Sequence, residues 1–252
     1  MSGKTEVAQN LDRFSRLEKS EKPPEGRQPK DLGAFPTQSV RACSPYTVVR
    51  SSEWQAAVDS ARTRCKRKAS RDPNYLSAVD VDNLIRAAAF AEQIGCPLHH
   101  HLIIRWPYGN WKLHKDTQAA LSKWLARHAG CPFYIWVKEA NTCPHSHFLL
   151  HLPKNGYNGG HVHHFTRRTL QRLANLPKIE TGAIRCTTVT WFGDPSENTA
   201  KRLFYLCKAG DATVQSLLGL TRNGHCPSGV GKRSGVSQSL GKTARKKGPG
   251  TW

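Results

Sequence analysis

The sequence lacks paired cysteines, an apolar leader and any long apolar run. Its eight cysteines are dispersed and none forms a CxxC pair, so nothing indicates a disulfide framework. The N-terminal stretch MSGKTEVAQNLDRFSRLEK has no apolar signal region. No apolar run is long enough to span a bilayer. We therefore expect a cytoplasmic protein whose thiols are reduced.

Acidic residues are scarce beside basic ones. The chain has 38 Lys and Arg but 18 Asp and Glu, for a formal net charge of +20. This balance indicates a polyanionic partner, because each cation that meets a phosphate releases a condensed counterion. Nucleic acid is favoured over a membrane surface, since no amphipathic basic helix rich in Trp and Leu is present. A protein that only coats nucleic acid is an alternative at this stage.

Hydrophobic residues are also sparse, at 38% of the chain, and the two ends account for much of the shortage. Residues 1–74 are rich in Lys, Arg, Glu, Ser and Pro, with one short helix possible over 51–66, and predict a flexible basic N-terminal region. Residues 221–252 carry seven cations and no acid among many Gly and Ser, and predict a flexible, disordered basic tail. Residues 75–220 remain as the folded domain.

The middle of the chain alternates between helical and strand patterns. Apolar residues at helical spacing predict helices in SAVDVDNLIRAAAFAEQIG, KDTQAALSKWLARHAG, TRRTLQRLANL and PSENTAKRLFYLCKAG. β-Branched and aromatic runs predict strands over 99–106, 133–140, 144–153 and 184–192. The second and third strands form an antiparallel hairpin. The order β-α-β-β-α-β-α predicts an α+β fold with a ferredoxin-like or RRM-like antiparallel sheet flanked by helices, one face of which could be open to a substrate.

Two histidines two residues apart are the first chemical signal. His145 and His147 lie on one predicted strand, so both imidazoles point to one face and can bind one cation. Glu139 lies on the partner strand and could supply a third ligand, which would leave positions for water and substrate. His151 shares the face of His147 and is an alternative ligand. A zinc site with Cys131 and Cys143 is a further alternative. His161, His163 and His164, just before a predicted helix, indicate surface or phosphate contacts, whereas His99–His101 are ambiguous.

A tyrosine and several cations form the second signal. Tyr205 and Lys208 are three residues apart on a predicted helix and face one way, and Lys201 and Arg202 lie nearby. A tyrosine in a cationic, metal-containing site can act as a nucleophile on phosphorus. The first predicted strand is followed by aromatic residues between cations, which could stack unpaired bases or simply pack at the sheet end. These candidate DNA-binding residues are Arg105, Trp106, Tyr108, Trp111 and Lys112.

Taken together, the strand PHSHFLLHLP, the preceding WVKE and the later YLCK resemble, in that order, the HUH endonuclease superfamily, over roughly residues 98–210. The strand 99–106 is similar to the family's weaker first motif. Ser146 stands where that family usually has a bulky apolar residue. Lys201 and Ala209 occupy the positions one turn from Tyr205, so the resemblance is to single-tyrosine rolling-circle replication initiators (Rep proteins) of plasmids and phages.

This resemblance implies a metal-dependent DNA endonuclease and strand transferase. His145, His147 and Glu139 would bind Mg²⁺ or Mn²⁺, Tyr205 would be the nucleophile and Lys208 would assist. Single-stranded DNA at an origin would be nicked and rejoined through a 5′-phosphotyrosine intermediate. No phosphate-cradling loop is present, so a host helicase and polymerase are the expected partners. A transposase or relaxase of the same superfamily, or a non-catalytic single-stranded nucleic-acid-binding module, are the alternatives.

Overall fold

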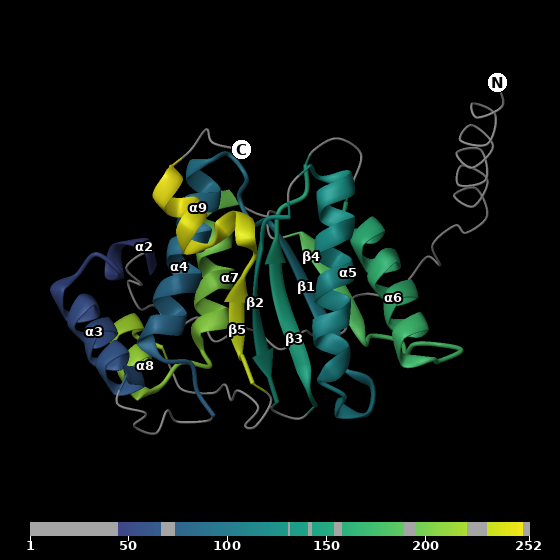
Figure 1. The fold of residues 1–252 in the computed structure, drawn as a ribbon, viewed down its shortest axis with the longest axis horizontal. Coiled ribbons are helices and arrows are strands. Elements are labelled where there is room, and N and C mark those ends of the chain that lie inside the picture. The colour runs from purple at the N-terminus through teal and green to yellow at the C-terminus, as the bar shows by residue number, and fades with distance from the viewer. Residues whose placement is uncertain are drawn as a thin grey trace, which may run out of the picture. The chain divides into compact units, whose positions relative to one another are not determined.

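The structure, a computed structural model, describes residues 45–66, 74–130, 132–140, 143–153, 158–188, 195–220 and 231–248. Its centre is a five-stranded sheet in the order β4-β1-β3-β2-β5, in which every pairing is antiparallel (Figure 1). The strands are β1 (His100–Arg105), β2 (Tyr134–Glu139), β3 (His145–Leu150), β4 (Ile184–Thr188) and β5 (Ser234–Val236).

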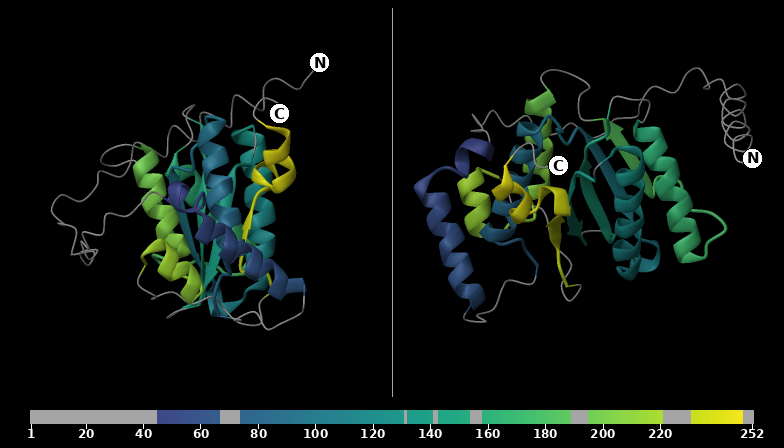
Figure 2. Two further views of the ribbon diagram at one scale, coloured as in Figure 1. Left: turned by 90° about the vertical axis from the view of Figure 1, so that its left-hand side faces the viewer. Right: turned by 45° about the horizontal axis from the view of Figure 1, so that its top comes forward.

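Two crossover helices explain the strand order. Helix α5 (Lys112–His128) joins β1 to β2, and α6 (Gly159–Ala174) joins β3 to β4. Because β3 lies between β1 and β2, the chain forms the split β-α-β arrangement that the sequence predicts. Both helices pack on the same face of the sheet (Figure 2). The predicted α+β fold with an antiparallel sheet flanked by helices is confirmed.

Strand alternation divides the core into two layers. The side chains of Leu102, Trp136 and Phe148 point to the face covered by α5 and α6. Their neighbours Val137 and Leu149 point to the opposite face. Helices α4 (Ala78–Gln93) and α7 (Pro195–Cys207) contribute to the core on that second face. Among the residues that the structure describes, no helix is long and apolar enough to cross a membrane.

The second face is therefore not open along its whole width, as the sequence had suggested it could be. Helices α4 and α7 bury it over β2 and β3, because Ile135, Val137 and Leu149 form an apolar surface there. Over β1 and β4 the same face stays accessible. Its side chains there include the half-buried Ile103 and the exposed Arg105, Arg185 and Thr187, whereas His101 on β1 is buried.

Local signals set the ends of the helices that carry this core. Ser77 caps α4, with its hydroxyl accepting from the Asp80 amide while the Asp80 carboxylate accepts from the Ser77 amide. Asn158 caps α6, which ends at Asn175 in the left-handed conformation with φ of 50°. These caps fix the residues at which the two helices begin and where α6 ends.

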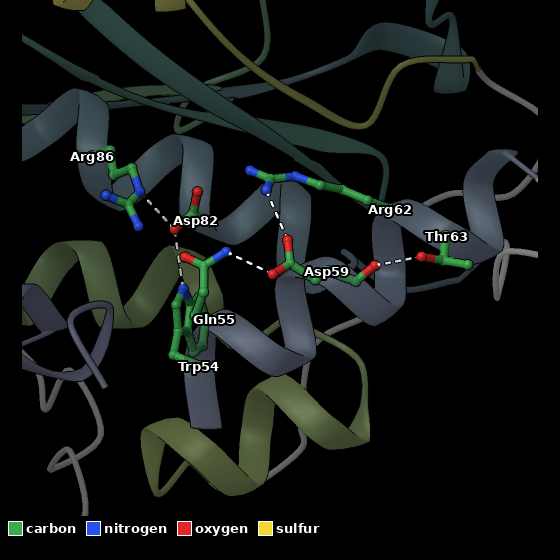
Figure 3. A network of polar contacts seen from close by, with 7 residues as sticks. All are labelled: Trp54, Gln55, Asp59, Arg62, Thr63, Asp82 and Arg86. Atoms are coloured by element: carbon green, nitrogen blue, oxygen red, sulfur yellow. Dashed lines mark hydrogen bonds and ion pairs between the residues drawn. The ribbon is translucent and has the colours of Figure 1, made fainter. Parts of the chain in front are cut away.

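The predicted N-terminal boundary at residue 74 is wrong for part of that region. Helices α2 (Pro45–Val48) and α3 (Ser52–Lys66) are packed onto α4. Trp54 is fully buried, and its Nε1 donates to Asp82 Oδ1 at 3.1 Å (Figure 3). Arg86 Nε pairs with the same oxygen at 2.8 Å. Trp54, together with the buried Val58 and Ala61, therefore attaches a mostly polar helix to the domain. Residues 1–44 and 67–73 lie outside the described part.

The predicted flexible C-terminal tail is also wrong over 231–248. Strand β5 pairs with β2, with Val236 opposite Ile135. It is followed by a 3₁₀ turn (Gln238–Leu240) and helix α9 (Lys242–Lys247), and Leu240 is fully buried in the core with α4. Composition concealed this segment because very few apolar side chains anchor it and the sheet supplies the backbone partners. Residues 221–230 and 249–252 lie outside the described residues.

If the C-terminal segment is part of the fold, Leu240→Ala should lower the free energy of unfolding by about 2–5 kcal/mol, because a fully buried leucine leaves a cavity. Denaturant unfolding followed by circular dichroism measures the loss. The exposed neighbour Gln238 provides the control, since Gln238→Ala should change stability by roughly 0.5 kcal/mol or less. Equally small losses of stability in the two variants would indicate that the C-terminal segment is flexible and not part of the fold.

A buried histidine makes the stability depend on pH. His114 in α5 is 2% exposed, and burial, followed by the charge of Lys138, lowers its pKa to about 3. Between pH 6.5 and about 3 the unfolded chain therefore binds a proton that the folded chain rejects, so stability falls as the pH falls. In His114→Gln the slope of unfolding free energy against pH in this window should be smaller by about 1.4 kcal/mol per pH unit. Unchanged slopes in urea titrations would contradict this.

Candidate metal centre

The hairpin of β2 and β3 brings three potential metal ligands together. Its register places Glu139 directly opposite His145, and Val137 opposite His147. His145 Nε2 lies 3.5 Å from Glu139 Oε2, and His147 Nε2 lies 3.4 Å from Glu139 Oε1. One ligand atom from each residue lies within 4.8 Å of the others. The predicted trio is thus one compact group that could hold a metal ion.

Both histidines are oriented by their second ring nitrogen. His145 Nδ1 donates to the carbonyl of Cys143 at 2.7 Å. His147 Nδ1 lies 3.0 Å from Nε2 of His101 on β1. When Nδ1 carries the hydrogen in each ring, so that His147 donates to His101, the lone pair on Nε2 is left for a cation. Such outer partners fix the tautomer and ring orientation of metal-binding histidines.

The charge state of the group suits a metal. Burial would raise the pKa of Glu139, but its contacts with His145 and His147 and the charge of Lys208 outweigh burial and hold the pKa below its ordinary value. Burial lowers the pKa of His147, although Glu139 opposes that shift. Burial also lowers the pKa of His101. An ionised carboxylate beside neutral imidazoles is the protonation state that metal binding requires.

Unmet polar atoms support the same interpretation. Both carboxylate oxygens of Glu139 and Nε2 of His147 are buried, and none makes a regular hydrogen bond to the described residues. The contacts of Glu139 are ion pairs instead, the shortest to Lys208 Nζ at 3.1 Å. Buried acceptors without hydrogen bonds are costly. A cation among these three atoms would satisfy them, so the residues present fit a metal ion.

Helix α7 brings the predicted tyrosine and lysine to this group. Lys208, just after the helix, has its Nζ 3.8 Å from the centre of the Tyr205 ring. That ring is edge-on to His147, with ring centres 5.4 Å apart. Arg202 is close enough to act on His101 electrostatically, and Lys201 is exposed. The structure therefore brings together the HxH strand, the hairpin glutamate and the YxxK helix.

The predicted DNA-binding residues do not form one group. Arg105 is exposed and lies opposite His145 across the β1–β3 pair, beside the metal centre. Trp106 is 4% exposed, and its Nε1 donates to Ser146 Oγ at 2.9 Å, so its predicted role in stacking bases is wrong. Trp111 and Lys112 lie at the start of α5, on the opposite face of the sheet. The side chain of Tyr108 lies outside the described part.

The partners of Ser146 explain why a polar residue is accepted between the two histidines. Ser146 is fully buried and points toward α5, where its hydroxyl meets both Trp106 Nε1 and His114 Nδ1. The position thus carries a small buried polar network in place of a bulky apolar side chain.

The alternative ligands do not join the group. His151 Nδ1 donates to the carbonyl of Pro97 at 3.0 Å, and its ring packs edge-on against His99. Among the residues with described positions, the cluster contains Glu139, His145 and His147 without His151 or Cys143. Cys131 lies outside the described residues. The exposed His161 sits in the first turn of α6, so that group is surface, as expected.

Sequence reasoning did not single out two residues of this site. His101 orients His147, and Arg185 on β4 lies opposite Ile103, on the face of the metal centre. The alternation of β1 shows that His101 and Arg105 share a face. That β1 lies beside β3 and β4 is decided by the sheet order, which no local pattern contains.

Mn²⁺ affinity tests the assignment of ligands. His101→Phe should weaken binding about 10–100-fold, because losing an outer partner releases the orientation of His147. His147→Ala should abolish binding. His151→Asn serves as the matched control and should bind as tightly as the unmodified protein. Isothermal titration calorimetry gives the three affinities, and a large loss in His151→Asn would move the third ligand away from Glu139.

Comparisons of the chain with protein-family models, with curated proteins and with solved structures found no match. The functional interpretation of this site therefore rests on its own geometry and chemistry. Those are a buried carboxylate between two oriented imidazoles, next to a tyrosine ring with a lysine ammonium above it.

Proposed function

We propose that the protein nicks and rejoins single-stranded DNA with Tyr205 as nucleophile, in a metal-dependent reaction. The observation that carries the proposal is the position of Tyr205, whose ring packs against His147 of the Glu139, His145 and His147 group. A tyrosine beside a metal group is suited to attack on phosphorus. Rolling-circle replication initiation, as in the superfamily that these motifs resemble, is the biological role we favour.

The proposed reaction is a transesterification at a DNA phosphodiester. The phenol oxygen of Tyr205 forms a bond to phosphorus while the bond from phosphorus to the 3′ oxygen breaks. The phenol proton is lost to solvent, and the leaving oxygen gains a proton. The product is a 5′-phosphotyrosine and a free 3′-hydroxyl, and joining is the reverse. A bound Mg²⁺ or Mn²⁺ would polarise the phosphate and steady the leaving oxygen.

A cation of the protein itself can also stabilise the negative charge that develops in this reaction. Lys208 Nζ lies over the Tyr205 ring and 3.1 Å from Glu139 Oε2, so it can stabilise negative charge that develops on the phenol oxygen or the phosphate. Its pairing with Glu139 also holds it in place before a substrate arrives. His101 orients His147 and does not touch the substrate in this scheme.

The accessible part of the sheet face offers a path for a strand. Arg105 and Arg185 are exposed on β1 and β4, and Lys201 and Arg202 lie on α7. Arg105 lies opposite His145, and Arg202 acts electrostatically on His101, so these two cations border the metal group. A single strand laid along them would bring one phosphate to Tyr205 while releasing counterions.

Two other functions use the same features. A transposase or relaxase would share the chemistry and differ only in the DNA it acts on. A binding module without catalysis would use the cations alone, but would not require a buried carboxylate between two imidazoles beside a tyrosine. The origin sequence and the host helicase and polymerase belong to the replication role and would be identified after the reaction itself.

The decisive experiment looks for the covalent intermediate. Incubated with Mn²⁺ and a library of labelled single-stranded oligonucleotides, the protein should form a species resistant to denaturation, and mass spectrometry should place the nucleotide on Tyr205. Tyr205→Phe should lose this species while binding DNA within about twofold, since only one hydroxyl is removed.

A matched control uses a tyrosine away from the site. Tyr46 donates its hydroxyl to Glu92 on α4, so Tyr46→Phe should still form the adduct. EDTA should prevent adduct formation in the unmodified protein and in Tyr46→Phe. Persistence of the adduct in Tyr205→Phe would assign the nucleophile elsewhere, and DNA binding without any adduct under all conditions would favour the binding module.

A further inference from the structure

A pocket lies on the opposite face of the sheet from the metal centre. Its volume is about 520 Å³, within the range of sites that hold small ligands. It opens between the start of α5 and strands β2 and β5. Two indole rings and four lysines line it: Trp111, Trp136, Lys112, Lys115, Lys138 and Lys232. Nothing in the proposed nicking reaction uses this pocket.

Four lysines gather around the pocket. Lys112 and Lys115 occupy the first turn of α5, which contains no acid, although the positive end of a helix dipole disfavours cations there. Lys138 is 7% exposed, and its Nζ lies 5.5 Å from the centre of the Trp111 ring and 5.7 Å from that of Trp136. Lys232 adds a fourth ammonium from the segment before β5. An anion would offset the charges of the exposed Lys112, Lys115 and Lys232.

His114 supplies an independent sign of a ligand. It lines the pocket and is 2% exposed, and its Nε2 makes no hydrogen bond to any described residue. Its Nδ1 lies 3.0 Å from Ser146 Oγ, which already accepts from Trp106 Nε1. If the serine hydroxyl donates to Nδ1, the hydrogens of Trp106 Nε1 and of the Ser146 hydroxyl both have acceptors, and Nε2 carries the hydrogen of the neutral ring. The buried ring then presents an unmatched donor to an acceptor in the pocket.

The wall formed by Trp136 depends on a glycine in β5. A Cβ on Gly235 would lie 2.8 Å from atoms of the Trp136 indole, so only glycine lets the ring lie across this strand. Gly235 is opposite Trp136 in the β2–β5 pairing. The C-terminal segment therefore contributes to the pocket through both Gly235 and Lys232.

We propose that this pocket binds a nucleotide, with its phosphate held by Lys112, Lys115 and Lys232 and its base against the indole rings. A base carbonyl or ring nitrogen would accept the hydrogen of His114 Nε2. Aromatic faces beside lysines are the combination that binds stacked bases and phosphates. The nucleotide would come either from a polynucleotide strand or from the free pool, since the recognised chemistry is the same.

Binding to the full chain in EDTA separates this proposal from metal-dependent nicking. Isothermal titration calorimetry would compare thymidine 5′-monophosphate, pentathymidylate, thymidine and inorganic phosphate as probes. We expect at least one of the two nucleotide probes to bind more tightly than thymidine or phosphate. The better of the two identifies the source. In Lys112→Glu/Lys115→Glu that binding should weaken about tenfold or more.

The control reverses equal charge elsewhere on the same helix. Lys123 and Arg127 are exposed in α5 and do not line the pocket, so Lys123→Glu/Arg127→Glu should bind the nucleotide as the unmodified protein does. All four substituted residues are exposed, so both variants should fold. In ¹H–¹⁵N spectra the Nε2–H signal of His114 should shift on nucleotide addition.

Three results would overturn the proposal. If inorganic phosphate bound as tightly as either nucleotide probe, the base would have no role in binding. Equal losses in the two charge-reversal variants would mean that net charge, and not this pocket, is responsible. Absence of any binding by the nucleotide probes would exclude the site. A failed Tyr205 adduct test has no bearing on these outcomes, because no metal or cleavage is involved.

Discussion

The register of the β2–β3 hairpin is the constraint on which the metal centre depends. It sets Glu139 across from His145 and places both on the face of α7. Because side chains alternate, a slip of one residue would turn Glu139 to the other face and bring Lys138 toward the histidines. A cation would then replace the only carboxylate of the group. The apolar partners Val137 and Leu149, buried against α4 and α7, hold the register that prevents this.

A buried carboxylate needs compensation, and the fold provides it from the neighbouring strand β3 and from the end of helix α7. A charge taken out of water is costly unless it is paired. Glu139 is fully buried, yet two imidazoles and Lys208 surround it. Since Lys208 directly follows α7, the packing that pairs it with Glu139 also fixes the position of Tyr205. The proposed nucleophile and the proposed metal site are thus positioned by one set of contacts.

The same two strands carry different chemistry on their two faces. On β2, Glu139 points to the metal group while Lys138 points to the lysine-lined pocket. On β3, His145 and His147 point one way, and Ser146 between them points to His114 in that pocket. The backbone of one hairpin separates the two sites by the thickness of a sheet. The metal group and the Ser146–His114 contact therefore use different side chains of the same hairpin.

Much of the site could be predicted from the sequence because its signals are local. Two histidines at strand spacing must share a face, and a short turn must bring Glu139 near them, whatever the rest of the chain does. Helical spacing likewise puts Tyr205 and Lys208 on one side of α7. The β-α-β-β-α-β order is enough to specify the class of fold, since the crossovers restrict how such strands can be arranged.

Tertiary structure alone decided what depends on distant pairing. Trp106 looked like a residue for stacking bases, but Ser146 and the core of α5 enclose it. Residues 231–248 resemble a tail by composition, yet β2 offers them a free edge and α4 offers Leu240 an apolar contact. His101 became part of the site because β1 lies beside β3. Local patterns determine which way a side chain points, whereas its neighbours are decided by the order of the strands in the sheet.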